Sequence, residues 1–427
     1  MIDGRGLEGA SSFATLCSLR NNDWTKILGW PGYRVYRSEI DEAAKTLKLW
    51  VRRKSGKLVC SGCGRTVVEI AEVSEREVRD LSCFEYRTTV VVELYRLRCP
   101  DCGIKTEKIV QLPSKAPFSK RFEDAVGEAC ESAAARRVAK QFDLAATTVR
   151  SIDLRYLERW AAQRRKPALR QLGVDEIHLG KKQKFLTVAS NLESGEPLWF
   201  GRERKKETLD EFFDTELSAR QRRGIDAACV DMWEPFRLSI EQWAPRCRIV
   251  FDKFHIMQHA NQAIDEVRRA EFFRKGGQMR GLVKGKRWLL LTRWINLTWD
   301  KRQKLNSLFA LNRKLFKAYV LKESLDRLWS YRYEGAMFNY LQRWIEQLRW
   351  QRLRPFEKLA DMLVNHLDGI LNYCRTQVPL GMVEAINGNI KSLLRRGRGY
   401  SNLRYLLLKA QRLAATRTEF VAFRKAA

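Results

Sequence analysis

Long hydrophobic runs are missing from this sequence of 427 residues. No stretch of about 18 consecutive apolar residues occurs, so we expect no transmembrane helix. The first residues, MIDGRGLEGASSF, lack the apolar centre of a secretory signal, and no repeat or low-complexity tract stands out. These absences argue against membrane-spanning, secreted and repeat-containing classes, and they predict a cytoplasmic protein.

Acidic residues are few relative to basic ones. Eighty Lys and Arg stand against fifty Asp and Glu, which gives a formal net charge of +30 and an isoelectric point near 10.0. Such a charge attracts polyanions, most commonly nucleic acid, although a generically basic protein without that partner has the same composition. Hydrophobic residues make up 45% and aromatic residues 11% of the chain, which is typical of globular domains.

Cysteine spacing is more informative here than cysteine number, because thiols stay reduced inside cells. The motifs CSGC and CPDC contain the pairs Cys60, Cys63 and Cys99, Cys102, and structural zinc takes four such thiolates in a tetrahedron. Alternating, Val-rich residues at 66–73 and 86–99 predict two antiparallel strands between the pairs. We predict one structural Zn²⁺ per chain. The alternative, reduced core thiols, is our interpretation of the other cysteines, Cys17, Cys83, Cys130, Cys229, Cys247 and Cys374.

The segment SAAARRVAKQFDLAATTVRSIDLRYLERW, residues 132–160, predicts two helices with a break at Asp143 and Leu144. One side of each helix is apolar, as in a helix-turn-helix. The first turns of the second helix usually read base edges, and here they contain Thr147, Thr148, Arg150 and Ser151. We therefore predict a DNA-binding element, although an ordinary helical hairpin has the same pattern.

A mixed α/β domain is predicted after the basic linker at 161–170. Strand-like segments occur at residues 168–179, 181–192, 197–204, 225–233 and 247–255, with a helix at 207–223 and a helical stretch near 239–244. From about residue 255 to 374 the sequence is helical and rich in Trp and Arg, which predicts an all-α module. An amphipathic helix at 381–396 follows.

Three carboxylates are candidates for a metal site. Asp175 lies in the first predicted strand, Asp231 ends the fourth, and the late amphipathic helix could pack its apolar face on the sheet and direct Glu384 toward them. Because three carboxylates repel one another, we expect a divalent cation such as Mg²⁺ between them. Each acid taken alone is more often a turn or helix cap. Glu176 is expected on the opposite strand face, in solvent.

These motifs, in this order, resemble the bacterial insertion-sequence transposases of the ISL-three family, within the DDE superfamily. The resemblance covers most of the chain, roughly residues 60–412, and REVRDLSCFEY at 76–86 is also similar to the family's N-terminal segment. It is carried by the cysteine pairs, the paired helices, and the motifs GVDE at 173–176, VDMW at 230–233, FDKFH at 251–255 and VEAINGNIKSLLRRGRGYSNLRYLLLK at 383–409.

The resemblance implies an RNase H-like core interrupted by a helical insertion domain. It implies that Asp175, Asp231 and Glu384 form the catalytic triad and bind Mg²⁺ or Mn²⁺, which would activate water to nick DNA before the freed 3′-hydroxyl attacks another phosphodiester. His255 matches a D-x-x-H signature, and it either supports the active site or joins strand to helix structurally. We expect basic residues of the late helix to hold the DNA backbone, namely Lys391, Arg395 and Arg396.

We therefore expect a multidomain α/β protein with the following parts: a region of unassigned role at 1–55, a zinc ribbon at 56–112, a helix-turn-helix domain at 113–166, the first part of the core at 167–256, a helical insertion at 257–374, and C-terminal core helices at 375–427. The leading functional prediction is a transposase that acts on the terminal inverted repeats of double-stranded DNA in the bacterial nucleoid, as a homodimer or larger assembly. The alternatives are a non-catalytic DNA-binding regulator and a structure-specific nuclease.

Overall fold

The computed structural model describes residues 20–113, 115–165, 167–179, 185–274 and 276–416. Cys17, residues 1–19 of the N-terminal region, residues 180–184 around the start of the second predicted strand, and residues 417–427 lie outside the described residues. The chain divides into two compact units, residues 1–162 and 163–427. No described helix is long and apolar enough to cross a membrane.

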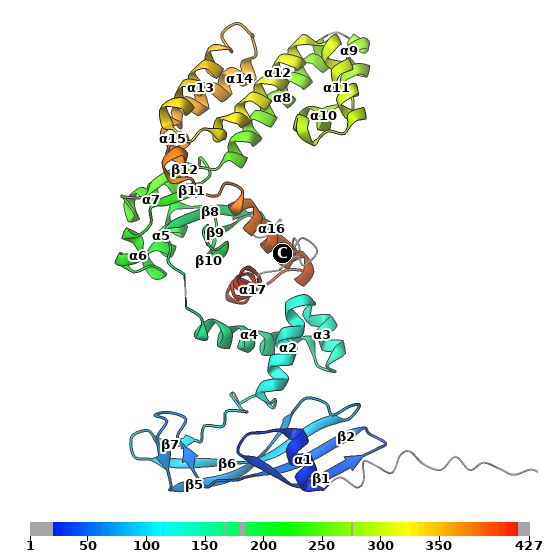
Figure 1. The fold of residues 1–427 in the computed structure, drawn as a ribbon, viewed down its shortest axis with the longest axis vertical. Helices are drawn as coiled ribbons and strands as arrows, with labels where there is room; N and C mark the ends of the chain where they lie inside the picture. The colour runs from blue at the N-terminus through cyan, green and yellow to red at the C-terminus, as the bar shows by residue number, and fades with distance from the viewer. Residues whose placement is uncertain (1–19, 114, 166, 180–184, 275, 417–427) are drawn as a thin grey trace, which may run out of the picture. The chain divides into compact units, whose positions relative to one another are not determined.

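The first unit contains a sheet that joins residues on both sides of position 55. Its elements are α1 (Asn21–Leu28), β1 (Tyr33–Asp41), β2 (Thr46–Arg53), β5 (Ile70–Arg79), β6 (Arg87–Cys99) and β7 (Gly103–Thr106), with the short strands β3 (Leu58–Val59) and β4 (Thr66–Val67) beside it. The strand order is β1-β2-β6-β5, with β7 paired to β6 (Figure 1). The antiparallel pairing of β5 with β6 is confirmed. Because β2 pairs with β6, the sheet crosses the expected boundary between residues 55 and 56.

Three helices follow the sheet: α2 (Lys120–Ser132), α3 (Ala135–Gln141) and α4 (Ala146–Gln163). The predicted break lies between α3 and α4, where Asp143 has a positive φ of 51°. A small apolar cluster, which includes Val138, Val149 and Ile152, holds the three helices together. The buried Glu123 on α2 adds ion pairs to Arg155 and Arg159 on α4.

The second unit contains a five-stranded mixed sheet with the order β10-β9-β8-β11-β12. The strands are β8 (Gln171–Ile177), β9 (Leu186–Asn191), β10 (Glu196–Arg202), β11 (Ala227–Val230) and β12 (Arg248–Phe251), which confirms all five predicted strands. β8, β9 and β10 are antiparallel neighbours, whereas β8, β11 and β12 run parallel. The carboxyl ends of the three parallel strands therefore meet at one edge of the sheet.

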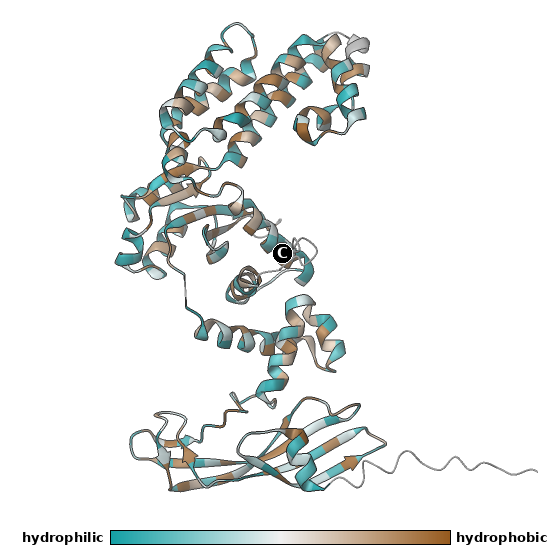
Figure 2. Cartoon of the chain, in the orientation of Figure 1, coloured by the Kyte–Doolittle hydropathy of each residue, from teal (hydrophilic) through white to brown (hydrophobic). Residues whose placement is uncertain are grey.

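Helices cover both faces of this sheet, because its strands are apolar on both sides. One face packs against α5 (Lys206–Thr215) and α7 (Glu234–Trp243). The other packs against α16 (Met382–Gly397) and α17 (Leu403–Ala415). Figure 2 shows hydrophobic residues along the strands and alternating hydrophobic and hydrophilic residues along the covering helices. The predicted helix at 207–223 is divided, since Ser218 begins the separate helix α6 (Ala219–Arg223).

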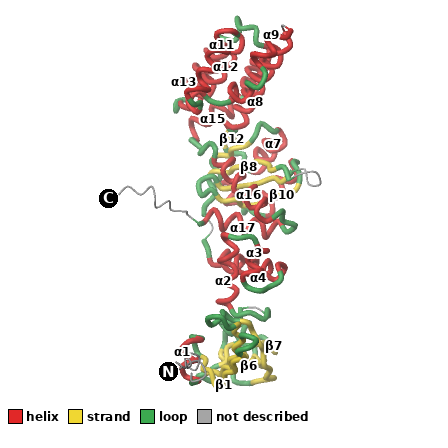
Figure 3. The backbone as a smooth tube through the Cα atoms, turned by 90° about the vertical axis from the view of Figure 1, so that its right-hand side faces the viewer, coloured by secondary structure: helices red, strands yellow, loops and turns green. Residues whose placement is uncertain are grey.

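A long helical segment separates β12 from α16. It contains α8 (Lys253–Arg274), α9 (Gly276–Val283), α10 (Arg287–Leu291), η2 (Trp294–Asn296), α11 (Trp299–Leu311), α12 (Arg313–Asp326), η3 (Arg327–Ser330), α13 (Glu334–Glu346), α14 (Arg354–Asn365) and α15 (Leu367–Thr376). No strand occurs among its described residues (Figure 3). This confirms the predicted all-α composition.

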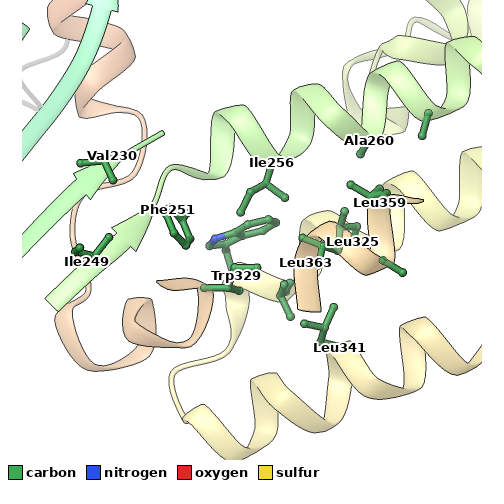
Figure 4. Packing of buried hydrophobic residues seen from close by; sticks show 14 of the residues in the cluster. Val230, Ile249, Phe251, Ile256, Ala260, Leu325, Trp329, Leu341, Leu359 and Leu363 are labelled. Carbon is green, nitrogen blue, oxygen red and sulfur yellow. The ribbon is translucent and has the colours of Figure 1, made fainter. Parts of the chain in front are cut away.

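The helical segment shares a hydrophobic core with the sheet. Phe251 on β12, Ile256 on α8 and Trp329 on η3 lie together at the junction (Figure 4). Helix α15 packs closely on β12, and a Cβ added at Gly369 would lie only 2.3 Å from the Phe251 ring. The glycine is therefore required for this contact.

Candidate active site and metal centre

Three acidic residues occupy the carboxyl ends of the adjacent parallel strands. Asp175 is near the end of β8, Asp231 directly follows β11, and Asp252 directly follows β12. The register pairs Val174 with Val230 and Val230 with Phe251, so the next residues lie at the same level on neighbouring strands. The parallel pairing therefore brings together acidic residues that lie far apart in the sequence.

His255 lies between the first two aspartates. Its Nε2 is 3.5 Å from Asp175 Oδ1 and its Nδ1 is 3.7 Å from Asp231 Oδ1. Burial alone would lower the pKa of His255, but the hydrogen bond to Asp175 and the charge of Asp231 raise that pKa to about 9. The ring is therefore positively charged at neutral pH in this arrangement. It balances part of the negative charge of the aspartates.

Helix α16 reaches the same place from the other end of the chain. Asn387 donates a hydrogen bond of 2.6 Å from Nδ2 to Asp175 Oδ2. The helix packs closely against β8 because Gly173 has no side chain. A Cβ there would lie 2.5 Å from Leu192 and 3.1 Å from Val383 on α16.

Glu384 lies in the first turn of α16, one turn before Asn387. Its side chain is exposed, and its negative charge raises the pKa of Asp252, for which burial is the larger cause. The apolar residues of the helix are buried on the sheet as predicted, at Val383, Ile386, Ile390 and Leu393. The structure thus brings Glu384 into the electrostatic neighbourhood of the strand-end acids without a direct contact to Asp175 or Asp231.

Glu176 differs from its sequence prediction. It does lie on the other strand face from Asp175, but it is not solvated, because its Oε2 is 2.8 Å from Arg204 Nε. The same guanidinium is 2.9 Å from Asp231 Oδ2 and stacks over the Trp233 ring at 4.2 Å. Burial raises the pKa of Glu176 to about 7, although the charge of Arg204 opposes this shift. The alternation of side chains along β8 predicted correctly which face of the strand carries Glu176. It could not predict that Arg204 covers this carboxylate.

The four paired cysteines come together in the first unit. Their thiol sulfurs all lie within 4.8 Å of one another, and the Sγ atoms of Cys63 and Cys99 are 3.5 Å apart. Four sulfurs at about 2.3 Å from one zinc ion would have similar separations. The backbone N–H groups of Cys63 and Gly62 lower the pKa of Cys60 to about 7, whereas burial raises the pKa of Cys99 and the hydrogen bond with Cys63 raises that of Cys102. A bound cation is what would favour the thiolate form of all four. The thiols therefore fit a structural zinc ion.

The expected DNA-contacting residues are largely exposed. Thr147, Arg150 and Ser151 are exposed in the first turns of α4, and Thr148 is half-buried. Ser151 Oγ donates to the Thr147 carbonyl at 3.1 Å. On α16, Lys391 and Arg395 are exposed and Arg396 is half-buried. Both sets remain accessible to a large ligand.

Two residues at the carboxylate cluster were missed by the sequence argument. Arg204 follows β10 in the run GRERKK, which resembles an ordinary solvated basic loop. The sequence offered one indication for Asn387: it lies three residues after Glu384, which places both side chains near the same side of a helix. Nothing in local sequence reveals that either side chain contacts an aspartate.

Two protein-family models match this chain. A transposase family model of the ISL3 group matches residues 172–410, which include all three strand-end aspartates and α16. A second model, described as the zinc-finger of transposase IS204/IS1001/IS1096/IS1165, matches residues 57–102, which include all four paired cysteines. The carboxylate-bearing sheet thus belongs to a DDE-type transposase domain, an enzyme that catalyses DNA transposition.

The chain is similar to full-length transposases over most of its length. The transposase for insertion sequence element IS1001 of Bordetella parapertussis is 31% identical over 386 residues, covering 89% of this chain and 95% of the relative. The transposase for IS1557 of Mycobacterium tuberculosis is 25% identical over 406 residues, covering 87% and 90%. This chain belongs to the ISL3 family of insertion-sequence transposases.

Proposed function

We propose that this transposase binds the terminal inverted repeats of its own element and carries out metal-dependent strand cleavage and strand transfer. The observation that carries the proposal is the meeting of Asp175 and Asp231 at adjacent strand ends, with α16 anchored on Asp175 through Asn387. In this proposal the sheet with its covering helices is an RNase H-like core, and the α8–α15 segment is an insertion within it.

Asp175, Asp231 and Glu384 would hold Mg²⁺ or Mn²⁺. Hard carboxylate oxygens are the donors that these ions prefer, and the aspartates already attract two cationic side chains, those of His255 and Arg204. When bound, the divalent cation supplies charge stabilisation for the attacking and leaving oxygens of phosphodiester displacement. Asn387 orients Asp175, and His255 adds positive charge beside the reacting phosphate.

DNA recognition is assigned to two surfaces. The first turns of α4 would read base edges through Thr147, Thr148, Arg150 and Ser151. The basic residues of α16, Lys391, Arg395 and Arg396, would bind phosphates next to the catalytic acids. The zinc ribbon would stabilise the first unit through Cys60, Cys63, Cys99 and Cys102.

The domain limits and the working assembly complete the proposal. The zinc ribbon would span residues 56–112, on a sheet that β1 and β2 extend before residue 55. The helix-turn-helix would span 113–166, the core 167–256 and 375–427, and the insertion 257–374. Transposition needs two DNA ends brought together, so we expect a homodimer or larger assembly on bacterial nucleoid DNA to be the working form.

The deciding experiment is cleavage of a labelled duplex that contains the element end and its flank, with Mg²⁺ or Mn²⁺. The wild-type protein should nick at the repeat boundary, and Asp231→Asn should not. Asp214→Asn is the matched control, because Asp214 is exposed on α5 and makes no ion pair with a described residue. Sequence-specific binding without cleavage in the wild-type protein, even with paired ends present, would contradict the proposal and favour a regulator.

A further inference from the structure

Exposed tryptophans gather in the helical segment, on elements that carry none of the assigned site residues. Trp288 on α10 is 70% exposed, Trp299 at the start of α11 is 72% exposed, and Ile295 between them is 72% exposed. Three large apolar side chains exposed within twelve residues of sequence favour a binding surface, since burying them is strongly favourable. We name residues 280–304 the α10–α11 surface.

Side chains of α12 hold the backbone of this surface in place. Lys322 is buried and donates to the carbonyls at the end of α10, at 3.1 Å to Leu290, 3.3 Å to Leu291 and 3.2 Å to Thr292. A cation is favourable at that position, because carbonyls at a helix C-terminus have no intrahelical partner. Glu323 accepts the Trp294 N–H at 3.0 Å. The exposed rings are therefore presented by an ordered loop.

The surface is strongly basic. Residues 280–304 contain eight lysines and arginines and one acidic residue, Asp300. Only Arg287 and Arg293 of these cations make ion pairs with described carboxylates. Arg287 stacks over the Trp288 ring at 5.4 Å, and Arg302 stacks over Trp294 at 5.4 Å. Lys301 and Lys304 are exposed and make no ion pair with a described carboxylate, so cations available to a ligand stand beside the exposed rings. This combination fits a partner that has both flat apolar faces and negative charge.

A chain of contacts connects the surface to the first turn of α8. Arg293 pairs with Asp326, and Asp326 also pairs with Lys253 at 2.8 Å. Lys253 begins α8 and stands two residues before His255. Arg293 of the α10–α11 surface is therefore linked through one carboxylate to the residue that begins the His255 helix, within the same unit.

We infer that the α10–α11 surface binds DNA with unpaired bases, which stack on Trp288 and Trp299 while the lysines and arginines hold phosphates. The inference rests on the proposed function, which supplies DNA with exposed strand ends. A duplex already stacks its bases internally, so exposed rings gain less from it than from a single strand. A second copy of this chain fits less well, because the surface would meet its own positive charge.

The test uses the full chain and a labelled single-stranded oligonucleotide of mixed sequence, by fluorescence anisotropy without added divalent cations. Trp288→Ala with Trp299→Ala should weaken binding about tenfold or more, since each stacked base contributes on the order of 1–3 kcal/mol. Tyr333→Ala is the matched control: Tyr333 is an 80% exposed aromatic residue in the same helical segment, beside the paired Glu334, and its loss should leave binding unchanged.

A second variant, Lys301→Glu with Lys304→Glu, keeps every aromatic ring. It should also weaken single-strand binding and reduce its salt dependence. The inference would be overturned if both variants bound the oligonucleotide as tightly as the wild-type protein. It would also be overturned if the variants lost self-association, measured by sedimentation, but kept their affinity for the oligonucleotide. Binding is measured without cleavage, so a wild-type protein that fails to nick element ends counts against the proposed function alone.

Discussion

Asn387 and Asp175 are 212 positions apart in sequence, yet the Asn387 amide donates a 2.6 Å hydrogen bond to the Asp175 carboxylate. This contact ties α16 to the central strand of the sheet. Because the amide occupies one lone pair of Oδ2, it fixes the direction in which the carboxylate presents its remaining lone pairs. Glu384 is carried by the same helix, so one contact affects two acids of the proposed triad.

Asn387→Ala should reduce cleavage of the element end by about 10- to 100-fold, the usual effect of removing a group that orients a metal ligand. The Mg²⁺ concentration for half-maximal cleavage should rise as well, which a purely structural defect would not produce. Asn389→Ala, an exposed position on the same helix, is the control and should behave as wild type. Equal cleavage and equal Mg²⁺ dependence in both variants would remove Asn387 from the site.

His255 should make the stability of the protein depend on pH when no divalent cation is added. Its pKa is raised to about 9, above the ordinary value of 6.5, because the hydrogen bond to Asp175 and the charge of Asp231 outweigh burial. The protonated His255 ring is favoured in the folded state, so its stabilising contribution is fully present below pH 6.5. The contribution is lost as the pH rises through 9. Its size is at most about 3.4 kcal/mol.

Urea denaturation between pH 6 and pH 10 measures this contribution. His255→Asn should flatten the decline above pH 6.5, and so should Mg²⁺, which would supply the positive charge instead. His259→Asn, exposed one turn later on α8, should retain the wild-type profile. A His255 variant with an unaltered pH profile would show that the ring is not charged between the aspartates.

The cysteine cluster predicts about one zinc ion per chain in protein purified without chelator. Cys63→Ser should lower the bound zinc toward zero and destabilise the first unit by several kcal/mol, since metal binding in such sites is coupled to folding. Cys83→Ser should keep the zinc, because Cys83 lies outside the cluster. Metal analysis by mass spectrometry gives the stoichiometry. The prediction would be wrong if wild-type protein purified without chelator contained no zinc and had the same thermal stability as the Cys63→Ser variant.

The buried Glu123 should dominate the stability of the three-helix element. Its carboxylate accepts from Arg155 at 2.8 Å and from Arg159 at 2.6 Å, and it is fully buried. Glu123→Gln leaves two arginines without their shared anion and should cost about 3 kcal/mol in the free energy of unfolding. Glu128→Gln, exposed on the same helix, should change it by less than about 0.5 kcal/mol. Chemical denaturation compares the two, and DNA affinity should fall only for Glu123→Gln.

Local patterns were enough for much of the fold. The paired cysteines, the antiparallel strands between them, the helix pair broken at Asp143 and the five strands of the mixed sheet all follow from spacing and alternation. Local patterns failed where a segment pairs with a distant one. The two strands before residue 55 received no role, because β2 joins them to the sheet through β6, more than thirty positions away, and sequence periodicity carries no record of such pairing.

The sequence by itself determined which residues are acidic at strand ends, which helix is amphipathic and which cysteines are paired, because these properties depend on neighbours within one turn or one strand. Only the tertiary structure decided that Arg204 covers Glu176 and Asp231, that His255 stands between two aspartates, and that Gly173 lets α16 approach β8. These contacts depend on the packing of elements far apart in the chain. Electrostatic energy depends on distance in space, so the charge balance of the site emerges only when the chain is folded.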